Sequence, residues 1–334
     1  MIKISINGFG RIGKSFLRTI MVDPIALQKI KIVAINIGPG TLKNVALLFK
    51  YDTIMGQYSG TVEQKENILI VDGHEIEIIQ ELDPLQINWK KYDIDWIVEC
   101  TGQFTKREEA QKHLKSGAKS VLISAPAHDE DVSIIPGVND HAYDSQKHRI
   151  ISLGSCTTNA FLPMLKVLHA DCGLENGYMT TAHAYTNSQV LLDVDEKDPR
   201  RSRAAALNIV PTTTGAAKMV GKIIPELKGK VDACAIRVPV GIVSYLTISF
   251  NFNKELSAES INDCFTNAAT TNLKGILDIT MEPLVSSDFI GSNYSVIIDG
   301  LMTQVVGNIA SVSGWYDNEW AYSMRMKDFL LSIV

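Results

Sequence analysis

The stretch "IKISINGFGRIGKSFLRTIMVD", residues 2–23, decides the class of fold. It opens with a short apolar run at residues 2–7, which predicts a buried strand. After the glycine-rich "GFGRIG", apolar residues recur on one face of a helix. They are Ile12, Phe16, Leu17, Ile20 and Met21. A second strand is predicted at residues 31–36, so the segment has the order of a strand–helix–strand unit and indicates a parallel sheet.

Three glycines of this stretch, Gly8, Gly10 and Gly13, form a GxGxxG pattern. Between a strand and a helix, such glycines permit a tight turn and a close approach of the backbone, and the helix N-terminus can hold a pyrophosphate. The alternative is a glycine-rich turn that binds nothing. Because the pattern lies between a strand and a helix, we predict a dinucleotide-binding site here.

The first half of the chain continues this alternation. Strand-like runs are at residues 95–100, 120–124 and 148–153, and a helical segment is at 106–117. Strands that alternate with helices predict an α/β fold, with a doubly wound parallel sheet of the Rossmann type that binds its ligand at the carboxyl ends of the strands. We therefore expect a dinucleotide-binding domain at residues 1–155.

The pattern changes after about residue 156. Longer runs, several of them alternating in hydrophobicity, predict strands, and helical signals are confined to residues 214–227 and 257–270. This combination predicts an α+β catalytic domain with a mostly antiparallel sheet at residues 156–317. The last segment, residues 318–334, reads as a helix that we expect to pack back on the first domain.

The composition excludes several classes of protein. The chain of 334 residues is 46% hydrophobic, and its net charge of −5 is spread along the sequence, so no nucleic-acid partner is expected. Five dispersed cysteines without zinc-site spacing argue for a reducing compartment and against a disulfide framework or a metal site. No apolar run approaches the ~20 residues of a membrane span, and the N-terminus lacks the apolar core of a signal peptide. We expect a cytoplasmic protein with no membrane partner.

The motif "GSCTTN", residues 154–159, is the first candidate for catalysis. A predicted strand runs into it and a helical pattern follows, so Cys156 is expected at a helix N-terminus, where the helix dipole favours a thiolate. The alternative is that its polar neighbours only cap the helix and that Cys156 is a small buried apolar residue. Those neighbours are Ser155, Thr157, Thr158 and Asn159.

A reactive cysteine needs a base, and His183 is the candidate. It lies in "TTAHAYTNSQ", a polar segment on a predicted strand, whereas the other histidines are expected on loops and helices. We predict that His183 lowers the pKa of the Cys156 thiol and acts in proton transfer. The alternative is an isolated histidine without a catalytic role.

Two segments are candidates for binding anions. The first holds Arg200, Arg201 and Arg203, for which a solvated loop is the alternative. The second places Thr214 and Gly215 just before a helix, where a phosphate can bind. A third candidate, Arg237, lies in an apolar strand pattern, and a charge in such a place needs a partner. An anionic substrate is one such partner.

Taken together, the motifs resemble phosphorylating glyceraldehyde-3-phosphate dehydrogenase along essentially the whole chain. The matching segments are "INGFGRIG", "KYDT", "ECTGQF", "GAKSVLISAP", "SCTTN", "HAYTNSQ", "RRSRAAALNIVPTTTGAAK", "RVP", "PLVSSDF" and "WYDNEWAYS". The resemblance implies that Cys156 attacks the aldehyde of glyceraldehyde 3-phosphate and that hydride passes to NAD. It also implies that inorganic phosphate cleaves the thioester to 1,3-bisphosphoglycerate, that His183 serves as acid and base, and that the enzyme is a homotetramer.

The resemblance also assigns residues to the binding sites. The substrate phosphate would be held by Thr186, Ser188 and Arg237. The attacking phosphate would be held by Ser155, Thr157, Thr214 and Gly215, with Arg201 near both. The cofactor would lie along Gly8, Gly10, Arg11, Ile12, Gly13, Asn36, Ile37, Thr101, Gly102, Ser124, Asn318 and Tyr322. Of these, Asn318 would hold the nicotinamide carboxamide.

One departure from the family bears on the cofactor. At the position of Ile37 the family commonly carries an aspartate that accepts hydrogen bonds from the adenosine ribose. Its loss weakens the usual preference for NAD and removes a repulsion against the 2′-phosphate of NADP. No positively charged side chain is expected near that phosphate. Gly38 and Gly40 offer only backbone groups, and Leu82 occupies the position where the family frequently has an arginine. We expect NAD as the cofactor, with NADP a poor second.

Two other functions stay open at this point. Erythrose-4-phosphate dehydrogenase shares the thiol and hydride chemistry, but it usually lacks the phosphate-site residues that this chain keeps at Thr186, Thr214 and Gly215. A binding protein on the same fold without catalysis is the second alternative, since fold alone does not imply function. Cys156 and His183 together argue against lost catalysis.

Overall fold

The glycine-rich stretch forms the predicted turn between a strand and a helix. In the computed structural model, which describes residues 1–334, strand β1 (Ile2–Asn7) leads through it into helix α1 (Arg11–Met21). Strand β2 (Ile30–Asn36) follows and lies parallel to β1. The strand–helix–strand unit is therefore confirmed.

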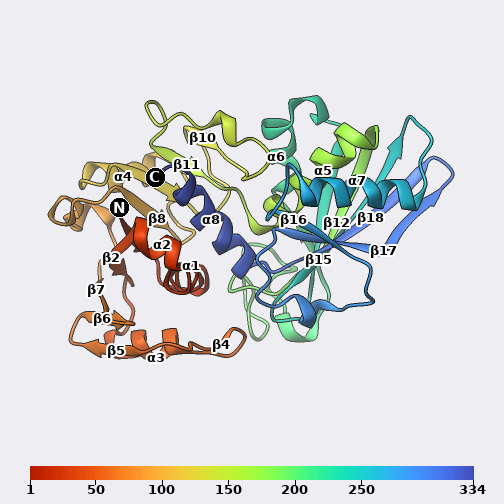
Figure 1. Cartoon of the computed structure of the whole chain (residues 1–334). Helices are drawn as coiled ribbons and strands as arrows, with labels where there is room; N and C mark the ends of the chain where they lie inside the picture. Colours follow the sequence, from red (N-terminus) through yellow and green to blue (C-terminus); the bar gives the residue numbers. More distant parts are fainter. The chain divides into compact units, whose positions relative to one another are not determined.

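The first sheet has nine strands in the order β10-β11-β9-β8-β1-β2-β7-β6-β5 (Figure 1). Its remaining strands are β5 (Val62–Lys65), β6 (Ile68–Val71), β7 (His74–Ile79), β8 (Trp96–Glu99), β9 (Ser120–Ile123), β10 (Val132–Ser133) and β11 (Ile150–Ser152). All pairs from β10 to β7 are parallel, and only β7–β6 and β6–β5 are antiparallel. The chain runs from β2 on one side of β1 to β8 on its other side, so the carboxyl ends of these strands form a switch point where ligands bind.

The chain divides into two compact units. The first unit comprises Met1–Pro136, Asp140–Ser155 and Ser323–Val334, and the second comprises Gly137–Asn139 and Cys156–Tyr322. Besides the sheet, the helices and short strands of the first unit are α2 (Pro24–Lys29), η1 (Leu42–Asn44), α3 (Val45–Lys50), β3 (Tyr51–Asp52), β4 (Gly56–Gln57), η2 (Pro84–Gln86), η3 (Trp89–Tyr92), α4 (Arg107–Lys115) and η4 (Asp140–Ala142).

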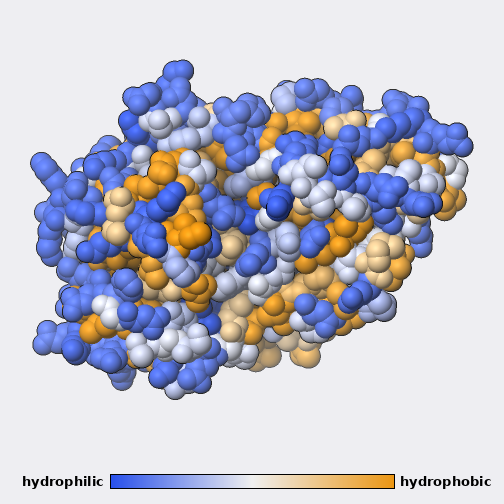
Figure 2. All heavy atoms as spheres, viewed as in Figure 1, coloured by the Kyte–Doolittle hydropathy of each residue, from blue (hydrophilic) through white to orange (hydrophobic).

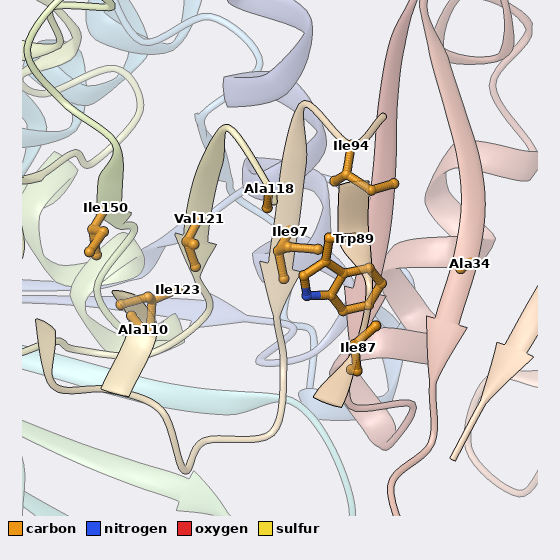
Figure 3. Packing of buried hydrophobic residues seen from close by; sticks show 10 residues of the cluster. All are labelled: Ala34, Ile87, Trp89, Ile94, Ile97, Ala110, Ala118, Val121, Ile123 and Ile150. Carbon is orange, nitrogen blue, oxygen red and sulfur yellow. The ribbon is translucent and has the colours of Figure 1, made fainter. Parts of the chain in front are cut away.

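An apolar cluster around Trp89 forms part of the core of the first unit (Figure 3). Its members are Ala34, Ile87, Trp89, Ile94, Ile97, Ala110, Ala118, Val121, Ile123 and Ile150. They come from α4 and the turn that follows it, from η3 and its flanks, and from the strands of the parallel sheet. Because strands of such a sheet are covered on both faces, apolar side chains follow one another directly, as in Trp96, Ile97 and Val98 of β8.

The second unit is built on a seven-stranded sheet in the order β13-β14-β12-β15-β18-β17-β16. Its strands are β12 (Leu174–Ala184), β13 (Val210–Thr213), β14 (Val231–Val238), β15 (Ser244–Phe252), β16 (Leu277–Thr280), β17 (Val296–Val306) and β18 (Ile309–Tyr316). Its helices are α5 (Cys156–Asp171), η5 (Ala205–Leu207), α6 (Ala216–Ile223), η6 (Pro225–Leu227), α7 (Ala258–Thr270) and η7 (Ser286–Phe289). The mostly antiparallel sheet is confirmed, although β12–β14 and β16–β17 are parallel pairs.

The last helix, α8 (Trp320–Ser332), begins in the second unit and continues into the first. Within the first unit, Nζ of Lys327 lies 2.5 Å from a carboxylate oxygen of Asp23, and the ring of Phe329 meets Trp96 edge-on at 5.8 Å. These contacts fasten the C-terminal part of α8 to that unit.

None of the helices combines the length and the apolar character that a membrane span requires. On the face drawn in Figure 2, hydrophilic and hydrophobic residues are interspersed.

Candidate active site

Cys156 is the first residue of helix α5, as the sequence pattern predicted. Its Sγ lies 3.4 Å from Nε2 of His183, a buried residue near the end of β12. At this distance a proton can pass directly between the thiol and the imidazole. The fold therefore joins the predicted nucleophile to the predicted base.

Arg237 lies directly opposite His183, because the two residues pair in the register of the parallel strands β12 and β14. Its Nη1 donates to the carbonyl oxygen of Ala184 at 3.0 Å and to Oγ1 of Thr186 at 3.3 Å, and it lies 3.0 Å from Nδ1 of His183. The guanidinium Nε is buried and has no hydrogen-bond partner. This polar group in an apolar strand thus keeps a donor for an anion.

The imidazole of His183 is neutral in this site. Burial, and next the positive charge of Arg237, lower the pKa of His183 to about 3. Its Nδ1 lies 2.6 Å from the carbonyl oxygen of Ala184, which only accepts hydrogen bonds. Nη1 of Arg237, which can only donate, lies farther from Nδ1 at 3.0 Å and has the carbonyl oxygen of Ala184 as an acceptor, so the shorter contact assigns the ring proton to Nδ1. The lone pair of Nε2 then faces Sγ, and His183 can act as a base.

The prediction that His183 lowers the pKa of Cys156 is wrong for this structure. Burial raises the pKa of the thiol, and the charge of Arg237 and the hydrogen bonds from Thr157 offset this only in part. A neutral imidazole supplies no positive charge to favour a thiolate. His183 therefore promotes the nucleophile by accepting its proton during the reaction, whereas the stabilising charge comes from Arg237.

Tyr316 is a further residue of the site that the sequence analysis missed. Its buried hydroxyl lies 3.0 Å from Oγ1 of Thr157 and 2.9 Å from Oγ1 of Thr181, and its ring meets His183 edge-on at 6.0 Å. Burial raises the pKa of Tyr316, so the phenol stays protonated. The only signal in the sequence was its place in "WYDNEW", which gives no hint of contact with Thr157.

The predicted anion-binding residues of the second unit are brought together in part. Thr186 and Ser188 lie next to Arg237, with their hydroxyl oxygens 2.9 Å apart. Arg201 donates from Nε to Oγ1 of Thr212 at 3.1 Å, and its charge acts on both His183 and Arg237. Arg201 therefore adds a second positive charge near Arg237, and the hydroxyls of Thr186 and Ser188 lie beside it.

The arginine cluster itself does not act as one group. Arg203 pairs with Asp193 at 2.6 Å on an exposed segment, and Arg200 is exposed, which fits the solvated-loop alternative for these two residues.

The residues predicted to bind the attacking phosphate lie near helix starts. Thr214 accepts from the backbone N–H of Ala216, and Gly215 is the N-cap of α6. Ser155 is the last residue of its segment of the first unit.

The three glycines of the GxGxxG pattern have different structural roles. A Cβ on Gly8 would lie 2.7 Å from the backbone nitrogen of Thr101, and one on Gly13 would lie 2.2 Å from the carbonyl oxygen of Gly8, so both positions require glycine for close packing. Gly10 is the N-cap of α1, and a Cβ there would meet nothing within 4 Å. The helix N-terminus therefore stands open at Gly10, which fits the pyrophosphate of a dinucleotide.

The other predicted cofactor residues of the first unit follow the carboxyl ends of β1, β2, β8 and β9. They are Arg11, Ile12, Asn36, Ile37, Thr101, Gly102 and Ser124. Arg11 forms an ion pair with Asp52, and Ser124 donates its backbone N–H to the carbonyl oxygen of Glu99. In the second unit, the amide oxygen of Asn318 accepts from Ser244 at 3.2 Å, and Tyr322 is buried.

Comparison with known proteins assigns the chain to a family. Residues 2–107 match the model "Glyceraldehyde 3-phosphate dehydrogenase, NAD binding domain", and residues 155–318 match the C-terminal domain of the same family. The chain belongs to the glyceraldehyde-3-phosphate dehydrogenase family. It is 46% identical over 329 residues to glyceraldehyde-3-phosphate dehydrogenase 1 of Bacillus cereus, covering 98% of this chain and 97% of that protein. To the enzyme of Geobacillus stearothermophilus it is 47% identical over 328 residues, covering 98% and 96%.

These matches confirm the resemblance drawn from the motifs. A relative from Streptomyces coelicolor, also named glyceraldehyde-3-phosphate dehydrogenase, is 45% identical over 334 residues and covers 99% of this chain and 98% of its own. The chain is therefore an NAD-dependent dehydrogenase of this family. No finding favours the erythrose-4-phosphate dehydrogenase alternative.

Proposed function

We propose that the protein catalyses the phosphorylating oxidation of glyceraldehyde 3-phosphate to 1,3-bisphosphoglycerate, reversibly and with NAD, as a step of glycolysis and gluconeogenesis. The observation that carries this proposal is the arrangement around one imidazole. Nε2 of His183 faces the Cys156 thiol at 3.4 Å, while Arg237 lies 3.0 Å from its Nδ1. A nucleophile, a base and a cation for an anionic substrate thus meet at one place.

The reaction begins with the thiol. His183 takes the proton from Cys156, the thiolate attacks the aldehyde carbon, and the imidazolium gives this proton to the aldehyde oxygen, which yields a hemithioacetal and restores the neutral imidazole. A bound NAD would supply the acceptor for the hydride that leaves this carbon. His183 takes the hydroxyl proton of the hemithioacetal, which becomes a thioester. Inorganic phosphate then attacks the thioester carbon, releasing the acyl phosphate and the Cys156 thiolate, which recovers its proton from His183.

The two phosphate groups need separate positions. For the substrate phosphate we assign Arg237, Thr186 and Ser188, a choice supported by the free donor of Arg237 and its contact with Thr186. For the attacking phosphate we assign Ser155, Thr157, Thr214 and Gly215, with Arg201 near both. The position of Gly215 at the N-cap of α6 supports this assignment.

We assign the cofactor to residues 1–155 together with the C-terminal helix at 318–334, and catalysis to residues 156–317. The residues that would hold NAD are Gly8, Gly10, Arg11, Ile12, Gly13, Asn36, Ile37, Thr101, Gly102, Ser124, Asn318 and Tyr322. Support comes from the open helix N-terminus at Gly10 and from the convergence of strand ends at the switch point.

A homotetramer in the cytoplasm is the proposed form of the enzyme. Large apolar side chains are exposed on one segment of the second unit, and a subunit interface would cover them. They are Leu191, Leu192, Leu207 and Ile209. The dispersed cysteines support a reducing compartment such as the cytoplasm.

The reaction can be tested with two substrates. In a rapid-mixing experiment with NAD, we expect glyceraldehyde 3-phosphate to give acyl phosphate only when inorganic phosphate is present. Erythrose 4-phosphate should be oxidised with a kcat/KM at least roughly a hundredfold lower, because one additional carbon would displace the aldehyde from Cys156 when Arg237 and Thr186 hold the phosphate. A preference for erythrose 4-phosphate would refute the proposed substrate.

The cofactor preference gives a second prediction. Ile37 cannot accept a hydrogen bond from the adenosine ribose, and nearby Leu82 is 69% exposed and supplies no charge for a 2′-phosphate. We expect NAD to exceed NADP in kcat/KM by about tenfold. The variant Ile37→Asp should widen this ratio by about a further tenfold, because the carboxylate binds the ribose and repels the phosphate. Steady-state rates with both cofactors measure this, and a higher kcat/KM with NADP would contradict it.

A further inference from the structure

A chain of buried polar side chains lies in the first unit, outside the residues assigned above to catalysis. At its centre, the carboxylate of Glu99 accepts from Nδ2 of Asn7 at 2.5 Å and lies 3.1 Å from Nε2 of His113. Its other oxygen accepts from both the backbone N–H and the hydroxyl of Thr101. Glu99 and His113 are fully buried. The buried carboxylate at the end of β8 thus has four hydrogen-bonding atoms around it, from Asn7, His113 and Thr101. A buried charge needs such partners, so we treat these contacts as an integral part of the fold.

The direction of these hydrogen bonds follows from their donors. The indole Nε1 of Trp89 can only donate, and it lies 3.1 Å from Nδ1 of His113. Nδ1 is therefore an acceptor without a proton, so Nε2 carries the ring proton and donates it to Glu99. Trp89 thus determines the tautomer of His113, and this tautomer is the one that Glu99 needs.

Trp89 is held firmly in place. It is completely buried, and its ring lies among Ile87, Ile94 and Ile97 of the apolar cluster (Figure 3). Its donor position is therefore set by packing. Without that N–H, His113 could move its proton to Nδ1, and the lone pair of Nε2 would then face the carboxylate of Glu99, which is repulsive.

Beyond Asn7, this series of hydrogen-bonded side chains continues to the loop that carries Ile37. Nδ2 of Asn36 donates to Oδ1 of Asn7 at 2.7 Å and to the carbonyl oxygen of Glu81 at 2.8 Å. Its Oδ1 accepts from the backbone N–H groups of Glu81 at 3.0 Å and Gly38 at 3.2 Å. All four hydrogen-bonding positions of the Asn36 amide are thus used within the protein. Asn36 thus ties the backbone at Gly38 to that at Glu81, and because its side-chain amide keeps no polar atom for the ribose, its part in the cofactor site is to position these two loops.

The glycine-rich turn and the Thr101 loop join at the same point. The backbone N–H of Gly8 donates to the carbonyl oxygen of Asn36, and that of Cys100 donates to the carbonyl oxygen of Asn7. Gly8 packs so closely on Thr101 that no Cβ fits between them. The Gly8 turn, the Gly38 loop and the Thr101 loop are therefore all fastened to side chains that end at Glu99.

We propose that Trp89 and His113 are positioning residues for NAD, acting through Glu99 on these three loops. Neither residue belongs to the loops themselves. Because Ile37 offers no side-chain ligand to the adenosine ribose, the backbone geometry at Gly38 bears more of the binding, and this geometry depends on the chain. This inference rests on the proposed use of NAD by the first unit.

The test uses Trp89→Phe, which keeps an aromatic ring in the apolar cluster and removes the N–H. Trp96→Phe is the matched control, because Trp96 is a buried tryptophan of the same unit, on β8, and the hydrogen bond to His113 comes from Trp89 and not from Trp96. NAD and ADP-ribose are titrated calorimetrically into the full-length variants, and Tm is recorded for each. We expect Kd for both ligands to rise about tenfold in Trp89→Phe and less than twofold in Trp96→Phe, with Tm lowered in both.

A second variant and a spectroscopic readout complete the experiment. His113→Phe should raise Kd by a similar factor. With ring-¹⁵N-labelled histidine, the His113 signals should show the Nε2–H tautomer in the parent protein and lose that signature in Trp89→Phe. Unchanged Kd values in Trp89→Phe despite a lower Tm would overturn the inference and leave the chain a purely structural role. Failure of the parent protein to bind NAD would instead refute the proposed function.

Discussion

Cys156→Ser abolishes dehydrogenase turnover and leaves NAD binding in place: this is the largest effect we expect. A serine hydroxyl is far less acidic than a thiol, so the imidazole of His183, which lies 3.4 Å from Sγ in the parent, cannot generate from it the anion that attacks the aldehyde. The loss in kcat should be roughly 10⁴-fold or more, as for other enzymes that lose their nucleophile. Initial rates with glyceraldehyde 3-phosphate and phosphate measure turnover, and calorimetric titration measures binding of NAD.

The matched control is Cys264→Ser. Cys264 is a partly buried cysteine of helix α7, outside the group of residues around His183. The turnover of this variant should stay within about twofold of that of the parent, because Cys264 is only partly buried and does not belong to the group of residues around Cys156 and His183. Dehydrogenase activity in Cys156→Ser within tenfold of the parent would refute the thioester mechanism.

His183→Asn is expected to have the second largest effect. Asparagine cannot take up a proton, so both proton transfers of the reaction lose their acceptor, and kcat should fall by roughly 10²- to 10⁴-fold. The pH dependence should change as well. In the parent, the imidazole 3.4 Å from Sγ can accept the thiol proton as iodoacetamide alkylates Cys156. In the variant the thiol must release its proton to water, so the alkylation profile should shift to higher pH than in the parent.

His169→Asn serves as control for this substitution. His169 lies late in helix α5, in the same unit but at the far end of the helix from Cys156. Its alkylation profile and kcat should match those of the parent. If His183→Asn showed the same alkylation profile as the parent, the pairing of thiol and imidazole would have no part in making the nucleophile.

The sequence by itself determined the local features of both units. The strand–turn–helix at Gly8 to Gly13, the switch from alternating strands and helices to a mostly antiparallel sheet, and the start of a helix at Cys156 all follow from patterns of a few neighbouring residues. Such patterns are readable because strand and helix periods, and the space that a glycine turn needs, are set locally. The motifs, matched in order and spacing, also sufficed to predict the family.

The tertiary structure alone decided how these residues act on each other. The parallel register of β12 and β14 sets His183 opposite Arg237, and the two are 54 positions apart in the sequence. Their shared burial then makes the imidazole neutral, which reversed the predicted source of thiol activation. Tyr316 and the chain from Trp89 to Glu99 were likewise invisible, because each depends on contacts between distant strands and loops. Pairing of distant segments sets burial and charge around a side chain, and no local pattern records it.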